Sequence, residues 1–435
     1  MESAGARRRQ RVNHDSEPVR AAATAPRRRI TLPKKERGRP IPKFTVNLSL
    51  SPEKRYEHIA PQFCDQITRS DLPGLFDELL YDIAGPSAGR WLVFFARRVL
   101  CRMHSREETA ELRGISRATG VAMHVLVAFN VLLDVLLGCT SGGVRVADEN
   151  GGLSDWRIVH FRALDWGMDR LREIVVELDF VRFEGGPVVA SSLTYFGYIG
   201  VLTGVRKGLS MSLNFRPHHD RSTRWKRLAF RWHQAMVVLG FREPISSMLR
   251  RVLLSPAVGE ASRRVTDTAA ELSTRGQYDA NEIQPLLSEF AGSRSTAAYL
   301  ILCQPKRVYI VEKDHCAASI RESDTFLTAY NHDAADEADP SQLAAAGAEL
   351  AATQAGSGMS EIVSYSLERK EHLDKLRGRR VRACDRELGR GDKSVTMEDV
   401  MRFVRDKEVS NEMTHYAVVM DPESGKILWR RCYDP

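Results

Sequence analysis

The hydrophobic pattern of this chain changes abruptly at Cys139, and that change limits the folds open to it. From Pro52 to Gly138 the apolar residues follow helical spacing, and Met123 to Leu137 predicts a nearly all-apolar helix. After Cys139, short alternating runs separated by glycine-containing turns, the first at Gly142-Gly143, predict an antiparallel meander. Helices and hairpins then alternate to the end of the chain. Sheets that precede and follow helices indicate an α+β fold.

Individual segments follow from the same patterns. Strands are expected at Phe44 to Leu50, Thr140 to Asp148, Arg157 to Leu164, Val175 to Phe183, Pro187 to Leu193 and Leu209 to Arg216. Helices are expected at Arg221 to Gly240, Pro244 to Leu254, Ala261 to Ser273 and Asn281 to Phe290, and later hairpins at Ala297 to Lys313 and His415 to Arg431. No repeat of fixed period is visible, which argues against a solenoid or propeller.

The positive charge is concentrated at one end. Of the net charge of +8, residues 1–43 carry 13 Lys and Arg against 4 Asp and Glu, so the remainder is close to neutral. This proline-rich segment predicts a disordered basic tail, followed by a mainly helical region over 44–138 and a second region over 139–435. An Ala- and Asp-rich stretch near 334–358 is expected to be a surface insertion. Binding of nucleic acid is therefore a possibility for the tail and is not expected of the folded part.

The composition excludes several other classes. The seven cysteines show no spacing typical of a metal site, so neither a metal nor another cofactor is expected. The longest apolar stretch, Val125 to Cys139, is too short to cross a bilayer and contains Asn130 and Asp134. No apolar segment follows the N-terminal arginines, so a signal peptide is not expected and the default location is the cytoplasm.

Two motifs then narrow the function. The run Gly138-Cys139-Thr140-Ser141, followed by His160-Phe161-Arg162-Ala163-Leu164-Asp165-Trp166-Gly167, resembles the conjugated-amide hydrolases among the N-terminal nucleophile hydrolases. It is most similar to the acid ceramidase and N-acylethanolamine acid amidase family. Segments that also resemble this family run from Phe44 to Tyr56, from Glu108 to Cys139, from Phe196 to Asn214 and from Cys432 to Pro435, so the resemblance spans about 44–435.

The resemblance implies an αββα four-layer sandwich and a mechanism. The chain would cut itself between Gly138 and Cys139, releasing a helical α subunit that stays bound to the β subunit. The freed α-amino group has a reference pKa of about 7.7 to 8.0 and would act as the base, while the Cys139 thiol is the nucleophile. Arg162 would lie near the sulfur and favour the thiolate, and Asp165 would orient the amine.

Further positions are implied by the same resemblance. Asn331 is expected to donate its amide to the oxyanion, and Arg369 is expected to be the second arginine of the site, with Arg377, Arg379 and Arg380 as competitors. Tyr198 and Asn214 are expected to contact substrate. The chain departs from the family in Gly138, in Asn214-Phe215-Arg216 where a glutamate is usual, in its insertion, and in lacking the leader expected for the family's lysosomal address.

The expected activity is hydrolysis of the amide bond of a lipid amide, ceramide or N-acylethanolamine, through a thioester at Cys139. The alternatives are an amidase for other conjugated amides, like bile-salt hydrolases and penicillin acylases, and a non-catalytic lipid-binding protein that retains the fold. Two stretches that mix arginines with aromatic residues, Arg90 to Arg102 and Trp225 to Trp232, are typical of helices that contact a membrane surface, although one buried and one solvated face would give the same pattern.

Overall fold

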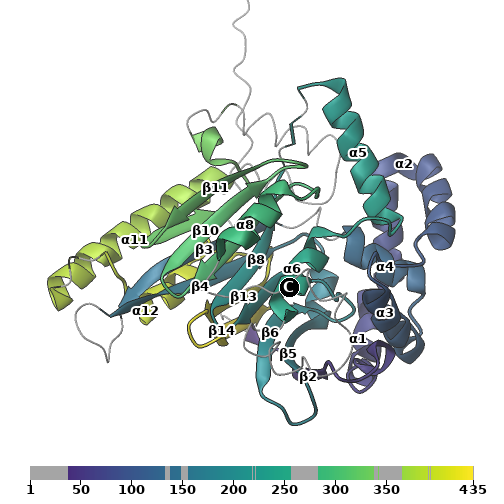
Figure 1. The fold of residues 1–435 in the computed structure, drawn as a ribbon, viewed down its shortest axis with the longest axis horizontal. Helices are drawn as coiled ribbons and strands as arrows, with labels where there is room; N and C mark the ends of the chain where they lie inside the picture. The colour runs from purple at the N-terminus through teal and green to yellow at the C-terminus, as the bar shows by residue number, and fades with distance from the viewer. Residues whose placement is uncertain are drawn as a thin grey trace, which may run out of the picture.

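The computed structural model describes residues 38–132, 138–147, 155–217, 219–220, 222–255, 283–337, 341, 365–389, 391 and 393–434. Within these residues the strands form two sheets (Figure 1). The six-stranded sheet has the order β1 (Gly38–Arg39), β14 (Lys426–Tyr433), β13 (Thr414–Asp421), β4 (Trp156–Asp165), β3 (Gly138–Ala147) and β12 (Phe326–Ala329). The eight-stranded sheet has the order β11 (Ala318–Ser323), β10 (Arg307–Lys313), β9 (Ala298–Gln304), β8 (Leu209–Phe215), β7 (Thr203–Arg206), β6 (Val188–Tyr195), β5 (Val175–Val181) and β2 (Lys43–Asn47).

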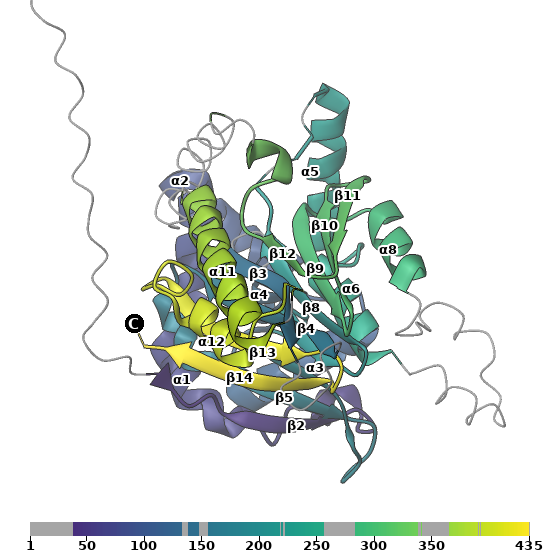
Figure 2. The same ribbon diagram turned by 90° about the vertical axis from the view of Figure 1, so that its left-hand side faces the viewer.

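Helices cover the outer faces of the two sheets, which gives four layers (Figure 2). Helix α12 (Met397–Arg405) packs on β3, β4 and β13, and α11 (Ser366–Leu388) packs beside it. On the other side, α6 (Ile245–Leu254) lies on β6 and β7, and α8 (Ile283–Gly292) lies on β10 and β11. The inner faces of the sheets contact each other through β3, β4, β8 and β9. The α+β expectation is confirmed, and the layers are in the order helix, sheet, sheet, helix.

The period of two in β4 explains which side chains reach the space between the sheets. Val159 and Phe161 pack with Phe403 on the helix side. His160 and Arg162 alternate with them and so face the eight-stranded sheet. A cation is thereby placed inside the sandwich by the same alternation that builds the outer core.

The N-terminal region contributes a cap of helices and one edge strand to each sheet. Its helices are η1 (Pro52–Lys54), η2 (Ala60–Phe63), α1 (Cys64–Ser70), α2 (Leu72–Val99), α3 (Arg106–Thr119) and α4 (Met123–Leu132). Strand β1 pairs with β14, and β2 pairs in parallel with β5. Two short helices, η4 (Asp169–Ile174) and η5 (Ala334–Glu337), and the projecting α5 (Arg224–Val238) complete the described elements. None of the described helices is long and apolar enough to cross a membrane.

Four expectations need correction. The strands after Cys139 do not form one meander, because β3 and β4 belong to one sheet while β5 to β8 belong to the other. Gly142-Gly143 is not a turn but the middle of β3, where a Cβ on Gly143 would lie 2.7 Å from Cβ of Val308 in β10. The tail does not extend to residue 43, since β1 is paired.

The fourth correction concerns the insertion expected at 334–358. It begins with η5, in which Asp336 is buried and accepts a hydrogen bond from the Asp333 amide, so its first residues belong to the folded body. Most of the remaining stretch, the helix expected at Ala261 to Ser273, residues 133–137 of the apolar helix and residues 1–37 of the tail lie outside the described residues.

Candidate active site

Strand β3 begins at Gly138, so Cys139 occupies the second position of a strand that is paired on both sides. Cys139 pairs with Leu164, and Gly138 pairs with Asp165 at the end of β4. The antiparallel register therefore brings the start of one strand against the end of the other. Residues 25 and 27 positions apart along the chain become paired neighbours, which brings the two motifs of the sequence together.

Cys139 lies between the sheets, where it contacts Arg162. Nη2 of Arg162 donates to Sγ of Cys139 at 2.9 Å and to the Leu213 carbonyl at 2.6 Å. Nη1 donates to Oγ1 of Thr203 at 2.7 Å and to the Leu202 carbonyl. The Arg162 side chain is completely buried, and no carboxylate of the described chain lies within ion-pair distance of it. The Cys139 thiol, once deprotonated, would serve as the counter-ion of Arg162.

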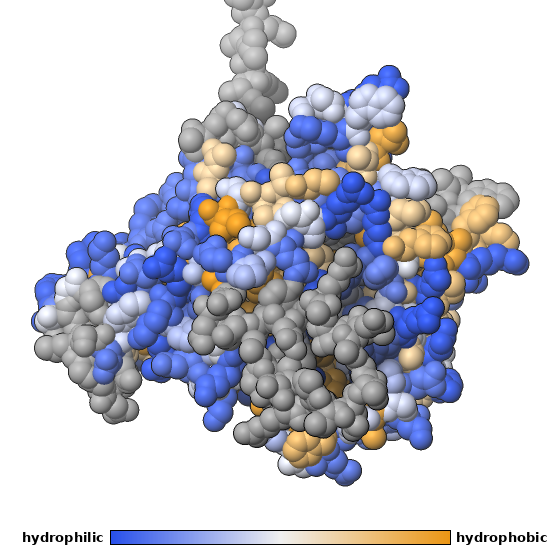
Figure 3. All heavy atoms as spheres, viewed as in Figure 1, coloured by the Kyte–Doolittle hydropathy of each residue, from blue (hydrophilic) through white to orange (hydrophobic). Residues whose placement is uncertain are grey.

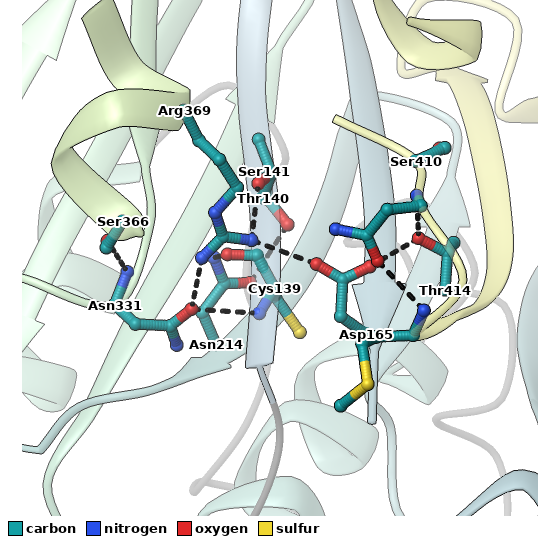
Figure 4. Close-up of polar contacts among 12 residues, drawn as sticks. Cys139, Thr140, Ser141, Asp165, Asn214, Asn331, Ser366, Arg369, Ser410 and Thr414 are labelled. Carbon is teal, nitrogen blue, oxygen red and sulfur yellow. Dashed lines mark hydrogen bonds and ion pairs between the residues drawn. The ribbon is translucent and has the colours of Figure 1, made fainter. Parts of the chain in front are cut away.

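Asp165 lies on the helix side of the six-stranded sheet and is held from two directions (Figure 4). Its Oδ2 forms an ion pair of 2.9 Å with Nη1 of Arg369, which reaches in from α11. Its Oδ1 accepts a hydrogen bond of 2.6 Å from the Thr414 hydroxyl at the start of β13. The Thr414 hydroxyl in turn accepts from the Asn411 amide at 2.9 Å. The orientation of the carboxylate is thus fixed at both oxygens.

Asn331 connects the two faces of the site. Its Oδ1 accepts from the backbone N–H of Cys139 at 3.1 Å and from Nη2 of Arg369 at 3.2 Å. Its Nδ2 donates to the Phe215 carbonyl at 2.9 Å, and its own amide N–H donates to the Ser366 hydroxyl. Asn331 therefore faces the nitrogen of Cys139 through its amide oxygen, and the expected oxyanion role of Nδ2 stays a prediction.

Asn214 lies on β8 opposite the nucleophile. Nδ2 of Asn214 donates to the Ala329 carbonyl at 3.1 Å and approaches the Cys139 carbonyl at 3.4 Å, and its Oδ1 accepts from the Ser141 hydroxyl. Asn214 thus holds the first residues of β3 against the second sheet. Its expected contact with substrate stays a prediction.

Burial dominates the electrostatics of the site. Burial raises the pKa of the Cys139 thiol, while the Arg162 guanidinium acts in the opposite direction. Arg162 does oppose protonation of the sulfur, as expected from the sequence, but burial outweighs it in the uncut chain. Burial also raises the pKa of Asp165, and Arg369 and Thr414 oppose this rise. Arg162 is the cation that most favours the Cys139 thiolate, and Arg369 is the cation that most favours the Asp165 carboxylate.

The other sequence expectations are placed as follows. Tyr198 is buried after β6, with its ring edge-on to Phe129 of α4 at 5.8 Å. Of the competitors of Arg369, Arg377 lies over the Phe326 ring and Arg380 pairs with Asp399, so Arg369 is the one that the structure brings to Asp165. Among the described residues no group of His, Cys, Asp or Glu is arranged to hold a metal ion.

Sequence reasoning missed several hydroxyl groups that hold the site residues or their partners, namely those of Thr203, Thr414, Tyr416 and Ser366. Thr203 stands in a segment that resembled the family, and Thr414 lies just ahead of a predicted strand. Their spacing indicated strands and turns, but which hydroxyl meets which charge depends on sheet register, and no local pattern encodes that.

Comparisons with known proteins show which proteins this chain is similar to. The family model for the beta subunit of N-acylethanolamine-hydrolyzing acid amidase matches residues 39–103, which precede Cys139. N-acylethanolamine-hydrolyzing acid amidase of Caenorhabditis elegans is 33% identical over 184 residues, covering 40% of this chain and 47% of the relative. Acid ceramidase of Mus musculus is 29% identical over 191 residues, covering 41% of this chain and 46% of the relative.

Among solved structures, that of the Caenorhabditis elegans N-acylethanolamine-hydrolyzing acid amidase ortholog matches with a TM-score of 0.40 and 21% identity, covering 66% of this chain and 93% of that one. The sequence matches span about half the length of the curated relatives. These relatives are named as an N-acylethanolamine-hydrolyzing acid amidase and an acid ceramidase. Over these stretches the chain is similar to the acid ceramidases and N-acylethanolamine-hydrolyzing acid amidases.

Proposed function

We propose that this chain is a self-processing cysteine amidase that hydrolyses lipid amides, with ceramide and N-acylethanolamine as the leading substrates. The observation that carries the proposal is the contact between the Arg162 guanidinium and Sγ of Cys139 at 2.9 Å. A buried cation without a carboxylate partner is costly, and formation of a thiolate beside it offsets that cost. This arrangement supports Cys139 as the nucleophile.

The first reaction in this proposal is cleavage of the chain itself. Sγ of Cys139 attacks the carbonyl carbon of Gly138, the bond from that carbon to the Cys139 nitrogen breaks, and the nitrogen takes up a proton. Water then hydrolyses the resulting thioester, which restores the Cys139 thiol and leaves a carboxylate on Gly138 and a free amino group on Cys139. Oδ1 of Asn331 accepts from this nitrogen before cleavage and would orient the amine afterwards.

The second reaction consumes the lipid amide. The Cys139 amine takes the thiol proton, the sulfur attacks the substrate carbonyl, and the same nitrogen returns the proton to the departing amine. Water hydrolyses the acyl thioester to a fatty acid and regenerates the thiol. Asp165, held by Arg369 and Thr414, would help to orient this amine.

Intact mass and N-terminal sequencing test the cleavage without a choice of substrate. Purified protein is held at acidic and at neutral pH beside a Cys139→Ala variant. We expect two chains from the wild type, the larger beginning at Cys139, and a single chain from the variant. A wild type that stays uncut at every pH and resists thiol-reactive lipid probes would refute the proposal and favour the lipid-binding alternative. Cleaved protein is then assayed with ceramide, N-acylethanolamine and bile-salt amides to rank the substrate classes.

We also propose that the amidase contacts a membrane surface through α2 and α5. Trp225, Leu228 and Trp232 lie along one stripe of α5 and are 67%, 58% and 58% exposed. On α2, Phe94 and Phe95 are also exposed, and arginines flank both stripes. In Figure 3 apolar residues lie among charged ones on the side where these helices are found in Figure 1. Aromatic residues bordered by cations suit an interface of anionic lipid.

Co-sedimentation with phosphatidylserine vesicles tests this contact. The double variant Trp225→Ser/Trp232→Ser should lose most of its binding, because two exposed indoles supply much of the insertable area. Phe183→Ser is the matched control, since Phe183 is 55% exposed in the turn between β5 and β6, away from α5. Equal binding of the double variant and the wild type would contradict the proposal.

A further inference from the structure

The Arg162 guanidinium makes hydrogen bonds through both of its terminal nitrogens, and the contacts of one nitrogen influence the direction of the other. Nη2 faces Sγ of Cys139, and Nη1 carries the bond of 2.7 Å to the Thr203 hydroxyl. The Nε atom is buried and has no hydrogen-bond partner. Since the guanidinium is planar, the Thr203 hydroxyl at Nη1 contributes, together with the Leu202 and Leu213 carbonyls, to where the hydrogens of Nη2 point.

The Thr203 hydroxyl is itself oriented by a chain of hydrogen bonds. The Arg162 guanidinium can only donate hydrogen bonds, so Oγ1 of Thr203 is the acceptor. The Thr203 hydroxyl lies 2.9 Å from the Tyr416 hydroxyl, which donates to the Leu193 carbonyl at 3.1 Å. Because the Tyr416 hydrogen is used there, Thr203 donates its own hydrogen to the Tyr416 oxygen. The Thr203 and Tyr416 hydroxyls therefore each point in one defined direction along this series of hydrogen bonds.

This chain of hydrogen bonds crosses the interior of the sandwich. Thr203 and Leu193 belong to the eight-stranded sheet, while Arg162 and Tyr416 belong to the six-stranded sheet. Both Thr203 and Tyr416 are completely buried, so water does not compete for their hydroxyls. A buried hydroxyl that is satisfied in both directions has one orientation, and it transmits that orientation to the arginine.

We propose that Thr203 and Tyr416 are positioning residues that aim the Arg162 guanidinium at Sγ of Cys139 and so set the reactivity of the thiol. The inference rests on the proposed role of Cys139 as nucleophile. Thr203→Val keeps the shape of the side chain, the Arg162 charge and the Leu202 carbonyl as an acceptor. It removes one of the two hydrogen bonds of Nη1, so the guanidinium is held less firmly toward the sulfur and the burial of the sulfur is less strongly opposed.

Two further variants separate aiming from packing. Thr203→Ser restores the hydroxyl and should rescue the effect. Thr194→Val is the matched control, because Thr194 on β6 is also buried and its hydroxyl has no hydrogen-bond partner. The same chemical change is thereby made in the same core without touching Arg162.

The readout is thiolate absorbance at 240 nm as a function of pH, with the spectrum of the same protein carrying Cys139→Ala subtracted. We expect Thr203→Val to raise the midpoint of thiolate formation by about half to one pH unit, as loss of one hydrogen-bonding contribution implies. Self-cleavage, followed by intact mass at one pH, should slow by about tenfold. Thr203→Ser and Thr194→Val should stay close to the wild type.

A midpoint for Thr203→Val equal to that of Thr194→Val would overturn the inference. If Thr203→Val fails to fold, Tyr416→Phe carries the test, since it leaves the Thr203 hydroxyl in place and should shift the midpoint in the same direction by a smaller amount. An unshifted Tyr416→Phe would then overturn it. Failure of the proposed function is recognised separately, because a wild type that does not cleave still gives a thiolate midpoint.

Discussion

Arg369 is the cation that most favours the charged form of Asp165. It reaches from α11 to Asp165 and to Asn331, and it approaches the Thr140 hydroxyl at 3.3 Å. Asp165 is buried, and burial raises its pKa, while the nearby Arg369 guanidinium is the largest of the influences that favour its charged form. One guanidinium thus connects the carboxylate to the amide that faces the Cys139 nitrogen.

Replacement of this arginine should change the pH dependence of self-cleavage. In Arg369→Gln the pKa of Asp165 rises further, so the carboxylate forms only at higher pH. We expect the acid limb of the profile of cleavage rate against pH to move to higher pH. At a fixed acidic pH the cleavage rate should fall about tenfold for each pH unit of that shift. Arg386→Gln, an exposed position on the same helix, serves as control. Superimposable profiles for both variants and the wild type would contradict this account.

At the scale of elements, the sequence predicted most helices and strands because their periodicities are local. The sorting of strands into two sheets was not predictable in this way, since β4 and β5 are neighbours in the chain but lie in different layers. Strands β11 and β12 went unrecognised because their half-buried residues are mixed in character. At the site, the two motifs predicted Cys139, Arg162 and Asp165, whereas the hydroxyl groups around them depend on register.

The start of α3 shows how tertiary contacts redirect a local motif. The Ser105 hydroxyl accepts from the Glu108 amide, as a capping box requires. The Glu108 side chain turns instead to the Ser247 hydroxyl of α6, at 2.9 Å. Burial there raises the pKa of Glu108 to about 7. Its neighbour Glu107 is half-exposed and pairs with Arg55, which lowers the Glu107 pKa despite partial burial.

Neutralising these two glutamates should therefore have opposite effects on stability. The fold disfavours the charged form of Glu108. The free energy of unfolding therefore falls as the pH rises from about 4.5 through 7, because the unfolded chain loses this proton more readily than the folded one. Glu108→Gln should stabilise the protein at pH 8 by about 1 to 3 kcal/mol and have little effect at pH 4. Glu107→Gln should destabilise it at neutral pH and lose that effect in acid. Melting temperatures of both variants and the wild type across this pH range test the prediction. If both variants changed the melting temperature in the same direction at pH 8, the opposite roles given to Glu107 and Glu108 would be wrong.

For the whole molecule, the N-terminal region is built into the sandwich and does not simply rest on it. Strand β1 extends the six-stranded sheet, and β2 extends the eight-stranded one. A buried ionic cluster adds a third attachment, in which Arg250 of α6 forms two hydrogen bonds with Glu111 of α3, at 2.5 and 2.7 Å, and Arg55 binds the same carboxylate. These contacts lie on both sides of the proposed cleavage position and support the proposal that the two chains stay together after the cut.

The position of Cys139 at the beginning of a doubly paired strand has a consequence for the lifetime of the protein. The proposed cut would fall between the first and second residues of β3 and leave the other strands in place, so the native state would barely change, while the unfolded state would become two separate molecules. Refolding would then depend on concentration, and dilute cleaved protein would not recover its fold once lost. The mature enzyme would persist through the slowness of its unfolding, and each molecule could be assembled only once.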